Sequence, residues 1–283
     1  MEDRQQSDVT KATATRKWLK LLVKAVIVIV LVFIPVSIKA ANENSELPVV
    51  IIRVDDIQDF AFREAQLFLI SESIINQVPL SLAVIAGMFG RDNDIVTSVK
   101  QAVSQGTEVT VHGWEHEDFT RFSLEEQSAI LSVSRSRIKN VLGYHADVLV
   151  PPMFSFNEDT LTAMHDEDYT SISTFVDVQS PGLVGDALSI PATVELSDFS
   201  EGTWKMKSPD ATLIEISESV RRYGYAAIVT HPQEFISEGK LDPANAESFR
   251  FLLKVLKENY SLKTFKELGE TRSPKLNGLF IKG

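Results

Sequence analysis

Two kinds of apolar pattern alternate along most of the chain. Short unbroken apolar runs, rich in Val and Ile, are typical of strands that are buried on both faces. Stretches with apolar positions three and four residues apart are typical of amphipathic helices. The runs predict strands over residues 49–54, 80–85, 107–111, 148–150, 171–176, 188–194 and 226–230. The amphipathic stretches predict helices over residues 61–76, 95–105, 124–141, 158–165, 212–223 and 245–259.

This alternation predicts an α/β fold in which helices cover a parallel sheet. Local signals support the helix boundaries. Ser123 and Glu126 have the spacing of a capping box at the start of the third predicted helix, and Gly143 follows its end. No internal repeat or second domain boundary is visible after residue 47.

The N-terminal segment has a different pattern. Residues 21–38 are apolar at all but three positions, and Arg16, Lys17 and Lys20 precede them. An apolar run of this length with a basic flank predicts a signal-anchor helix whose basic end stays in the cytoplasm. The alternative is a cleaved signal peptide, but neither Ala40 nor Ala41 completes a clean small-x-small cleavage site.

The organisation expected from these patterns has five parts. They are a cytoplasmic tail (1–20), a transmembrane signal-anchor (21–40), a linker (41–47), one folded domain (48–270) and a C-terminal tail (271–283). The domain is expected outside the cytoplasmic membrane, anchored by the helix, or secreted if the N-terminal segment is cleaved.

Composition limits the chemistry of any site. The chain of 283 residues has 44% hydrophobic residues and contains no cysteine, so a metal ion must be held by His, Asp or Glu. Residues 1–40 hold seven basic and three acidic residues of the 28 basic and 39 acidic in the chain, which leaves a net charge of −15 beyond residue 40. Such a domain repels nucleic acid and anionic lipid surfaces, and no nucleic-acid partner is expected.

Polar or rigid residues stand at the C-terminal ends of four predicted strands. In α/β barrels that edge of the sheet carries the active site. The residues are Asp55 and Asp56, His112, Pro151 and Pro152, and His231. His112 and His116 are four positions apart, a spacing that one helical turn would bring onto a single face. Two imidazoles and one carboxylate predict a metal site with open positions, suited to Zn²⁺, Co²⁺ or Fe²⁺.

The ordered set of motifs resembles the polysaccharide deacetylase family, the NodB-homology domain of carbohydrate esterase family 4. The motifs are Val54-Asp55-Asp56, His112-x3-His116, Val150-Pro151-Pro152 and Val229-Thr230-His231. The resemblance covers residues 48 to about 268 and implies an irregular (β/α) barrel of about seven strands. It also implies that Asp55 is the general base, that Asp56, His112 and His116 hold a divalent ion, most plausibly Zn²⁺, and that His231 is the general acid.

Two supporting positions depart from the family pattern. Where the third motif has an arginine that holds the base, this chain has Val150. Arg53 lies two residues before Asp55, on the same face of a strand, and is expected to supply the missing charge; the alternative is an ordinary surface or salt-bridged arginine. The fourth motif has an Asp and a Trp that support the acid. Asp177 is the positional candidate for the Asp, and Trp204 could supply the Trp from elsewhere in the chain.

The expected function is metal-dependent removal of N-acetyl or O-acetyl groups from an extracytoplasmic glycan. Trp114, between the two histidine ligands, either stacks on a sugar ring or packs beneath the site. Two other classes stay open. One is a catalytically weak or inactive member of the fold that only binds glycan, and the other is a metallohydrolase of a non-sugar amide.

Overall fold

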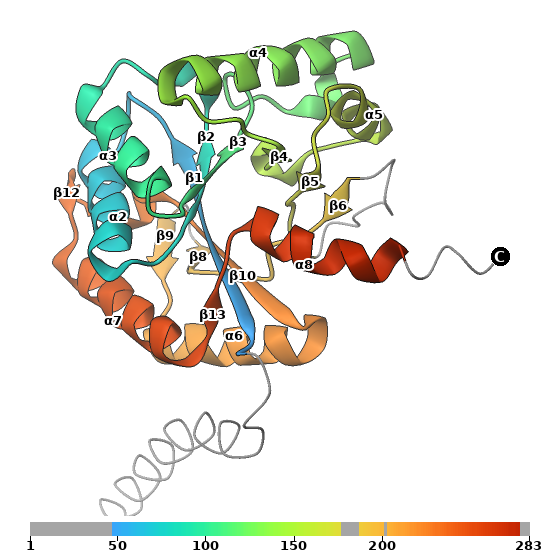
Figure 1. Cartoon of the computed structure of the whole chain (residues 1–283). Helices are drawn as coiled ribbons and strands as arrows, with labels where there is room; N and C mark the ends of the chain where they lie inside the picture. Colours follow the sequence, from blue (N-terminus) through green and yellow to red (C-terminus); the bar gives the residue numbers. More distant parts are fainter. Residues whose placement is uncertain (1–46, 177–186, 201–202, 278–283) are drawn as a thin grey trace, which may run out of the picture. The chain divides into compact units, whose positions relative to one another are not determined.

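A computed structural model describes residues 47–176, 187–200 and 203–277 (Figure 1). The chain divides into two compact units, residues 1–47 and 48–283, and every element below belongs to the second. The predicted tail, the membrane helix and the linker up to residue 46 lie outside the described residues. Among the described residues, no helix has the length and apolar character needed to cross a membrane.

The main sheet consists of parallel strands, and its order is β6-β5-β4-β3-β2-β1-β10-β7, with β13 paired to β1 beside this path. The strands are β1 (Val49–Ile57), β2 (Ser81–Val84), β3 (Glu108–Val111), β4 (Val148–Leu149), β5 (Ser171–Ile172), β6 (Leu188–Ser189), β7 (Val194–Glu195), β10 (Tyr225–Thr230) and β13 (Ser261–Leu262). Each of the seven predicted strand regions overlaps at least one of these strands.

The first and last strands of this order, β6 and β7, are consecutive in sequence. The segment that joins them donates from the N–H of Ala192 to the carbonyl of Thr174 (2.7 Å) and from the N–H of Thr193 to the carbonyl of Ala227 (2.8 Å). One extended segment therefore passes from the edge of β5 to the edge of β10 and closes the sheet. Counted with β6 and β7 as one segment and without β13, the described part of the barrel has seven strands. The expected irregular barrel is confirmed.

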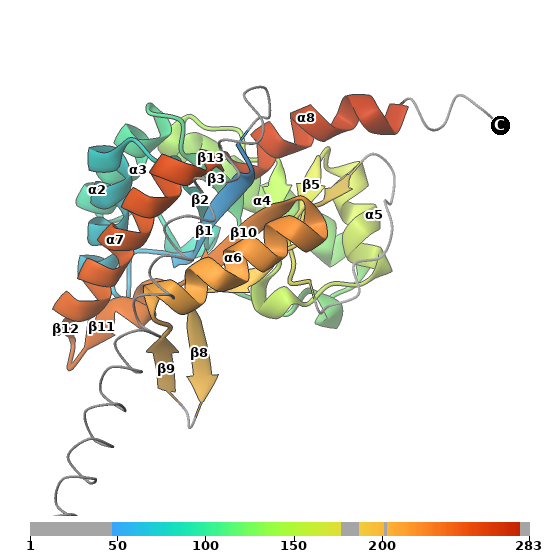
Figure 2. The ribbon, with the colours of Figure 1, turned by 90° about the horizontal axis from the view of Figure 1, so that it is seen from below.

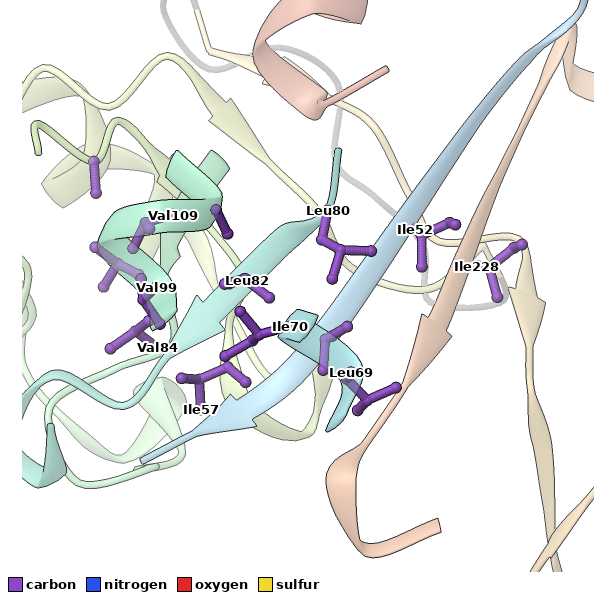
Figure 3. Close-up of a cluster of buried hydrophobic side chains, with 14 of the residues drawn as sticks. Ile52, Ile57, Leu69, Ile70, Leu80, Leu82, Val84, Val99, Val109 and Ile228 are labelled. Atoms are coloured by element: carbon purple, nitrogen blue, oxygen red, sulfur yellow. The ribbon is translucent and has the colours of Figure 1, made fainter. Parts of the chain in front are cut away.

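Helices surround the strands (Figures 1 and 2). They are α2 (Arg63–Asn76), α3 (Asn93–Val103), α4 (Leu124–Leu142), α5 (Glu158–Asp166), α6 (Pro209–Tyr223), α7 (Pro243–Asn259) and α8 (Phe265–Asn277). The capping box of Ser123 and Glu126 is present, and Gly143 ends α4 at a φ of 73°. The core lies between helices and strands: Leu69 and Ile70 of α2 pack with apolar side chains of β1 and β2 (Figure 3).

The structure also contains elements that the apolar pattern did not predict. Helix α8 continues past residue 270, where the domain was expected to end. The others are strand β13 and short 3-10 turns and hairpins: η1 (Ala86–Met88), η2 (Phe119–Arg121), η3 (Pro152–Phe154), η4 (Pro232–Phe235), β8–β9 (Ser197–Ser200 and Thr203–Met206) and β11–β12 (Ile236–Ser237 and Lys240–Leu241). Three of them, η3, η4 and β8–β9, carry residues of the candidate site.

Candidate metal and catalytic site

The candidate residues come together at one rim of the barrel. Asp55 and Asp56 lie near the C-terminal end of β1, His112 follows β3 directly, and His231 follows β10 directly. Because all these strands are parallel, their C-terminal ends face the same way. The fold therefore brings together residues that are up to 176 positions apart in the sequence.

Asp56, His112 and His116 form a convergent trio. Oδ1 of Asp56 lies 3.4 Å from Nε2 of His112 and 3.3 Å from Nε2 of His116. One potential ligand atom from each residue lies within 4.8 Å of the other two. Asp56 has a φ of 60°, which turns its carboxylate away from the regular alternation of β1 and toward the imidazoles. The trio has the donor atoms and the convergence that a divalent ion needs.

A loop, and not the expected helical turn, makes the two histidines converge. The residues between them have no helical structure, and Gly113 and His116 both have positive φ values, 74° and 63°. The carboxylate of Glu117 accepts hydrogen bonds from the N–H groups of Trp114 (2.9 Å) and Glu115 (2.6 Å) and holds the loop closed. At its φ of 74°, a Cβ at position 113 would lie 3.1 Å from that carboxylate, so any other residue would strain the turn.

The hydrogen bonds of the trio fit a bound cation. Nδ1 of His112 lies 2.7 Å from the carbonyl oxygen of Val150, which can only accept, so this nitrogen carries the hydrogen. Nε2 of His112 then presents its lone pair toward Oδ1 of Asp56, an atom that is buried and has no hydrogen-bond partner. Two electron-rich atoms that face each other in a buried place are stabilised by a positive ion between them.

The surroundings of Asp56 keep it ionised. Burial alone would raise the pKa of Asp56, but interactions with His112 and His116 and the charge of His231 outweigh it, so that the pKa of Asp56 lies well below its usual range. Gln233 adds a hydrogen bond from Nε2 to Oδ2 of Asp56 (3.2 Å). Asp56 is therefore held as a carboxylate with Oδ1 toward the imidazoles.

Arg53 is paired with Asp55 inside the barrel. Nε of Arg53 lies 2.8 Å from Oδ1 of Asp55, and Nη2 donates to Oδ2 at 2.9 Å. The guanidinium is 0% exposed, and Nη1 also donates to Oγ of Ser173 (3.0 Å), while the ring of Phe154 lies 5.4 Å away. Arg53 is thus no surface arginine: it donates a hydrogen bond to Oδ2 of the carboxylate that the family resemblance names as the base and lies at ion-pair distance from Oδ1.

The side chain of His231 is held by Glu234. Nδ1 of His231 lies 2.9 Å from Oε1 of Glu234, and the hydroxyl of Thr230 donates to Oε2 of the same carboxylate at 2.7 Å. Nε2 of His231 lies 4.0 Å from Oδ2 of Asp55. Burial lowers the pKa of His231, but the hydrogen bond to Glu234 and the charges of Asp55, Glu234 and Asp56 outweigh it and raise the pKa above its usual value.

Sequence reasoning missed Glu234 and Gln233. The residue expected to support the acid, Asp177, lies outside the described residues. A signal was present in the sequence, because Pro232 begins a 3-10 turn directly after His231. Residues three apart lie above one another in such a turn, and this places Glu234 beside the imidazole.

The remaining candidates surround these groups. Trp204 of β9 lies 5.4 Å from the His231 ring, centroid to centroid, at an interplanar angle of 34°. Trp114 packs against η1, where a Cβ on Gly87 would lie 2.7 Å from its Cε2. This contact favours packing over sugar stacking for Trp114. Pro151 and Pro152 are buried and start η3, the turn that brings Phe154 over Arg53.

Comparisons with known proteins agree with this geometry. A family model described as polysaccharide deacetylase matches residues 63–172, and no curated protein matches the chain. Among solved structures, a protein from Mycobacterium smegmatis described as a polysaccharide deacetylase superposes with a TM-score of 0.64 at 15% identity, over 82% of this chain and 93% of that one.

Two further structures bear on the chemistry. A family 4 acetyl xylan esterase from Clostridium thermocellum, in complex with a cobalt ion, has a TM-score of 0.55 at 13% identity, over 80% of this chain and 92% of that one. A CE4 family pseudoenzyme from Bacillus anthracis has a TM-score of 0.53 at 17% identity, over 79% and 66%. Identities this low show a shared fold and do not by themselves indicate a substrate.

Proposed function

We propose that this chain, which belongs to the polysaccharide deacetylase family, removes N-acetyl or O-acetyl groups from an extracytoplasmic glycan with the help of a divalent metal ion. The family comprises hydrolases that act on carbon-nitrogen bonds other than peptide bonds, or on acetyl esters. One observation carries the proposal: the Asp56, His112 and His116 trio lies at the same rim as the Arg53-held Asp55 and the Glu234-held His231.

The side chains support a division of roles. Asp55 takes the proton of the attacking water, and Arg53 fixes the direction of its carboxylate. His231 gives a proton from Nε2 to the departing nitrogen or oxygen, while Glu234 accepts from Nδ1. The proton that the base takes up is thereby matched by one that the acid releases. An ion held by Asp56, His112 and His116 would polarise the acyl carbonyl and make the water more acidic.

We propose Zn²⁺ as the ion, with Co²⁺ and Fe²⁺ as alternatives. Two imidazole nitrogens and one carboxylate oxygen suit all three. The cobalt ion in the family 4 acetyl xylan esterase supports the class of metal and not its identity in this chain.

The inactive alternative, a member of the fold that only binds glycan, has a precedent in the Bacillus anthracis pseudoenzyme. In this chain, the reason to consider that alternative is the valine at position 150, where the family has an arginine. Since Arg53 contacts both oxygens of Asp55, the base has a cationic partner from another position. This contact favours an active enzyme.

The test is acetate release from a panel of N-acetylated and O-acetylated oligosaccharides by the purified full chain, with chelator and after metal is restored. We expect release that is lost with chelator and absent in Asp55→Asn. The matched control is Asp94→Asn at a surface carboxylate, which should leave release unchanged. If the wild type releases no acetate from any glycan but binds one, the glycan-binding alternative replaces this proposal. Release from non-sugar amides alone would indicate a metallohydrolase of a non-sugar amide.

We also propose that residues 21–40 anchor the chain in the membrane with the domain outside the cytoplasm. The apolar run and its basic flank support this. In cells that express the full chain, the protein should stay in the membrane fraction after alkaline carbonate washing. Protease added from outside should cleave the domain, and its protection would contradict the proposed orientation.

A further inference from the structure

The β8–β9 hairpin carries two aromatic side chains that face each other across its strands. Phe199 and Trp204 are directly paired in the register, and their ring centroids lie 4.9 Å apart. Such a pair stabilises a hairpin, and this one forms a two-stranded sheet of its own. Yet Phe199 is 62% exposed and Trp204 is 38% exposed, so their contact covers only part of each ring.

The pair is continuous with the catalytic rim. Trp204 also lies against the ring of His231, at 5.4 Å between centroids. The three rings of His231, Trp204 and Phe199 therefore form a row, called here the aromatic row, that leads from the acid to the solvent. Figure 2 shows the hairpin projecting beyond the edge of the barrel.

The chemistry of the aromatic row suits a sugar ring. The C–H-rich face of a pyranose is apolar and flat, and its hydroxyls point sideways into water. Exposed aromatic rings beside a catalytic group offer the complementary apolar surface. The net charge of −11 on the chain disfavours a polyanion, so a neutral or amino sugar fits better.

We propose that Phe199 and Trp204 form a subsite for a sugar unit next to the unit that loses its acetyl group. The substrate is then a glycan of several units, bound along the hairpin, and not a single acetylated sugar. This inference rests on the proposed deacetylase function and adds to it the side chains that bind the neighbouring sugar unit. Trp204 contacts both the neighbouring sugar and His231, whereas Phe199 contacts the sugar and Trp204.

The experiment compares N-acetylated oligosaccharides of one to five units as substrates of the full chain. Phe199→Ala should raise KM about three- to tenfold for the longer substrates, which is the loss expected from one aromatic contact, with a smaller change for the monomer. Trp204→Ala should also lower kcat because it uncovers His231. Phe251→Ala changes a phenylalanine of α7 that is 48% exposed, and its kinetics should match the wild type.

A second variant and a second measurement separate the outcomes. Phe199→Leu keeps an apolar side chain on the hairpin but removes the flat face, so a loss that grows with substrate length in this variant supports the subsite. Equal losses at all lengths, or none, would overturn it. If the wild type hydrolyses nothing, the deacetylase proposal fails on its own. Calorimetric titration of the same oligosaccharides into wild type and Phe199→Leu then decides the subsite, and equal affinities would refute it.

Discussion

Replacing Glu234 by Gln tests how the general acid is supported. The change keeps the shape of the side chain and removes its negative charge. In the wild type, Oε1 accepts from Nδ1 of His231 at 2.9 Å, and Oε2 accepts from the hydroxyl of Thr230 at 2.7 Å. In Glu234→Gln, one of the two donors faces an NH₂ group and loses its acceptor.

The size of the effect follows from this contact. A hydrogen bond to a charged group contributes about 1.5–3 kcal/mol net, and each 1.36 kcal/mol in a barrier is tenfold in rate. We therefore expect kcat to fall about 10- to 150-fold. The loss should not exceed that of His231→Ala, because Glu234 acts only through the imidazole; a general acid contributes about 10²- to 10⁴-fold in total.

The pH dependence separates support of the acid from a general loss of structure. A general acid must be protonated, so activity falls as the pH rises through its pKa. Glu234 is one cause of the raised pKa of His231. In Glu234→Gln, the fall of activity at alkaline pH, the alkaline limb of the pH-activity profile, should therefore move to lower pH. Nitrogen-15 NMR of His231 should show the hydrogen leaving Nδ1, and the metal content should stay unchanged.

Glu247→Gln, the same change at a carboxylate that is 77% exposed on α7, provides the control and should leave the profile in place. An unmoved alkaline limb in Glu234→Gln would refute the reasoning. So would a loss larger than that of His231→Ala.

Three further predictions concern the other charged groups. Arg53→Met leaves the buried carboxylate of Asp55 unpaired, and urea denaturation should show a loss of about 3–5 kcal/mol in the free energy of unfolding, with loss of acetate release; an unchanged stability would contradict the buried pair. His112→Ala should lose bound metal, measured as metal per protein, whereas His231→Ala should keep it; metal loss in His231→Ala would make His231 a ligand. Glu108 accepts hydrogen bonds from the Ser81 hydroxyl and from the backbone N–H groups of Phe265 and Lys266, but its burial outweighs them and raises its pKa from 4.5 to about 7. The folded state therefore binds the proton more tightly, stability falls by about 3 kcal/mol as the pH rises from about 4.5 to about 7, and Glu108→Gln should flatten that dependence in urea titrations across this range.

The strands and helices of the barrel could be predicted because their burial leaves a direct mark on the sequence. A parallel strand covered on both faces is apolar at nearly every position, as in Val49 to Val54. The β8–β9 hairpin could not be found in the same way, because its strands are short and its aromatic side chains stay partly exposed. Its residues carry no unbroken apolar run.

Some contacts of the candidate site could also be predicted from the sequence, and others could not. Arg53 and Asp55 are two positions apart on one strand, so strand geometry alone placed them together. The convergence of His112 and His116 was expected for the wrong reason, since their approach depends on positive φ values that sequence spacing does not reveal. Trp204 reaches His231 from 27 positions away through a hairpin, and no local rule predicts that contact.

Both departures from the family motifs concern groups that support the acid and the base, and in both cases the structure places a support close in sequence. The partner of Asp55 comes from two positions earlier on β1, and the partner of His231 comes from three positions later, on η4. Each pairing is then set by one local geometry, the period of a strand or of a 3-10 turn, and does not depend on where β4 ends. Arg53 therefore holds the base without an arginine at position 150. The backbone carbonyl of Val150 still orients His112, and this contact does not depend on the side chain at that position.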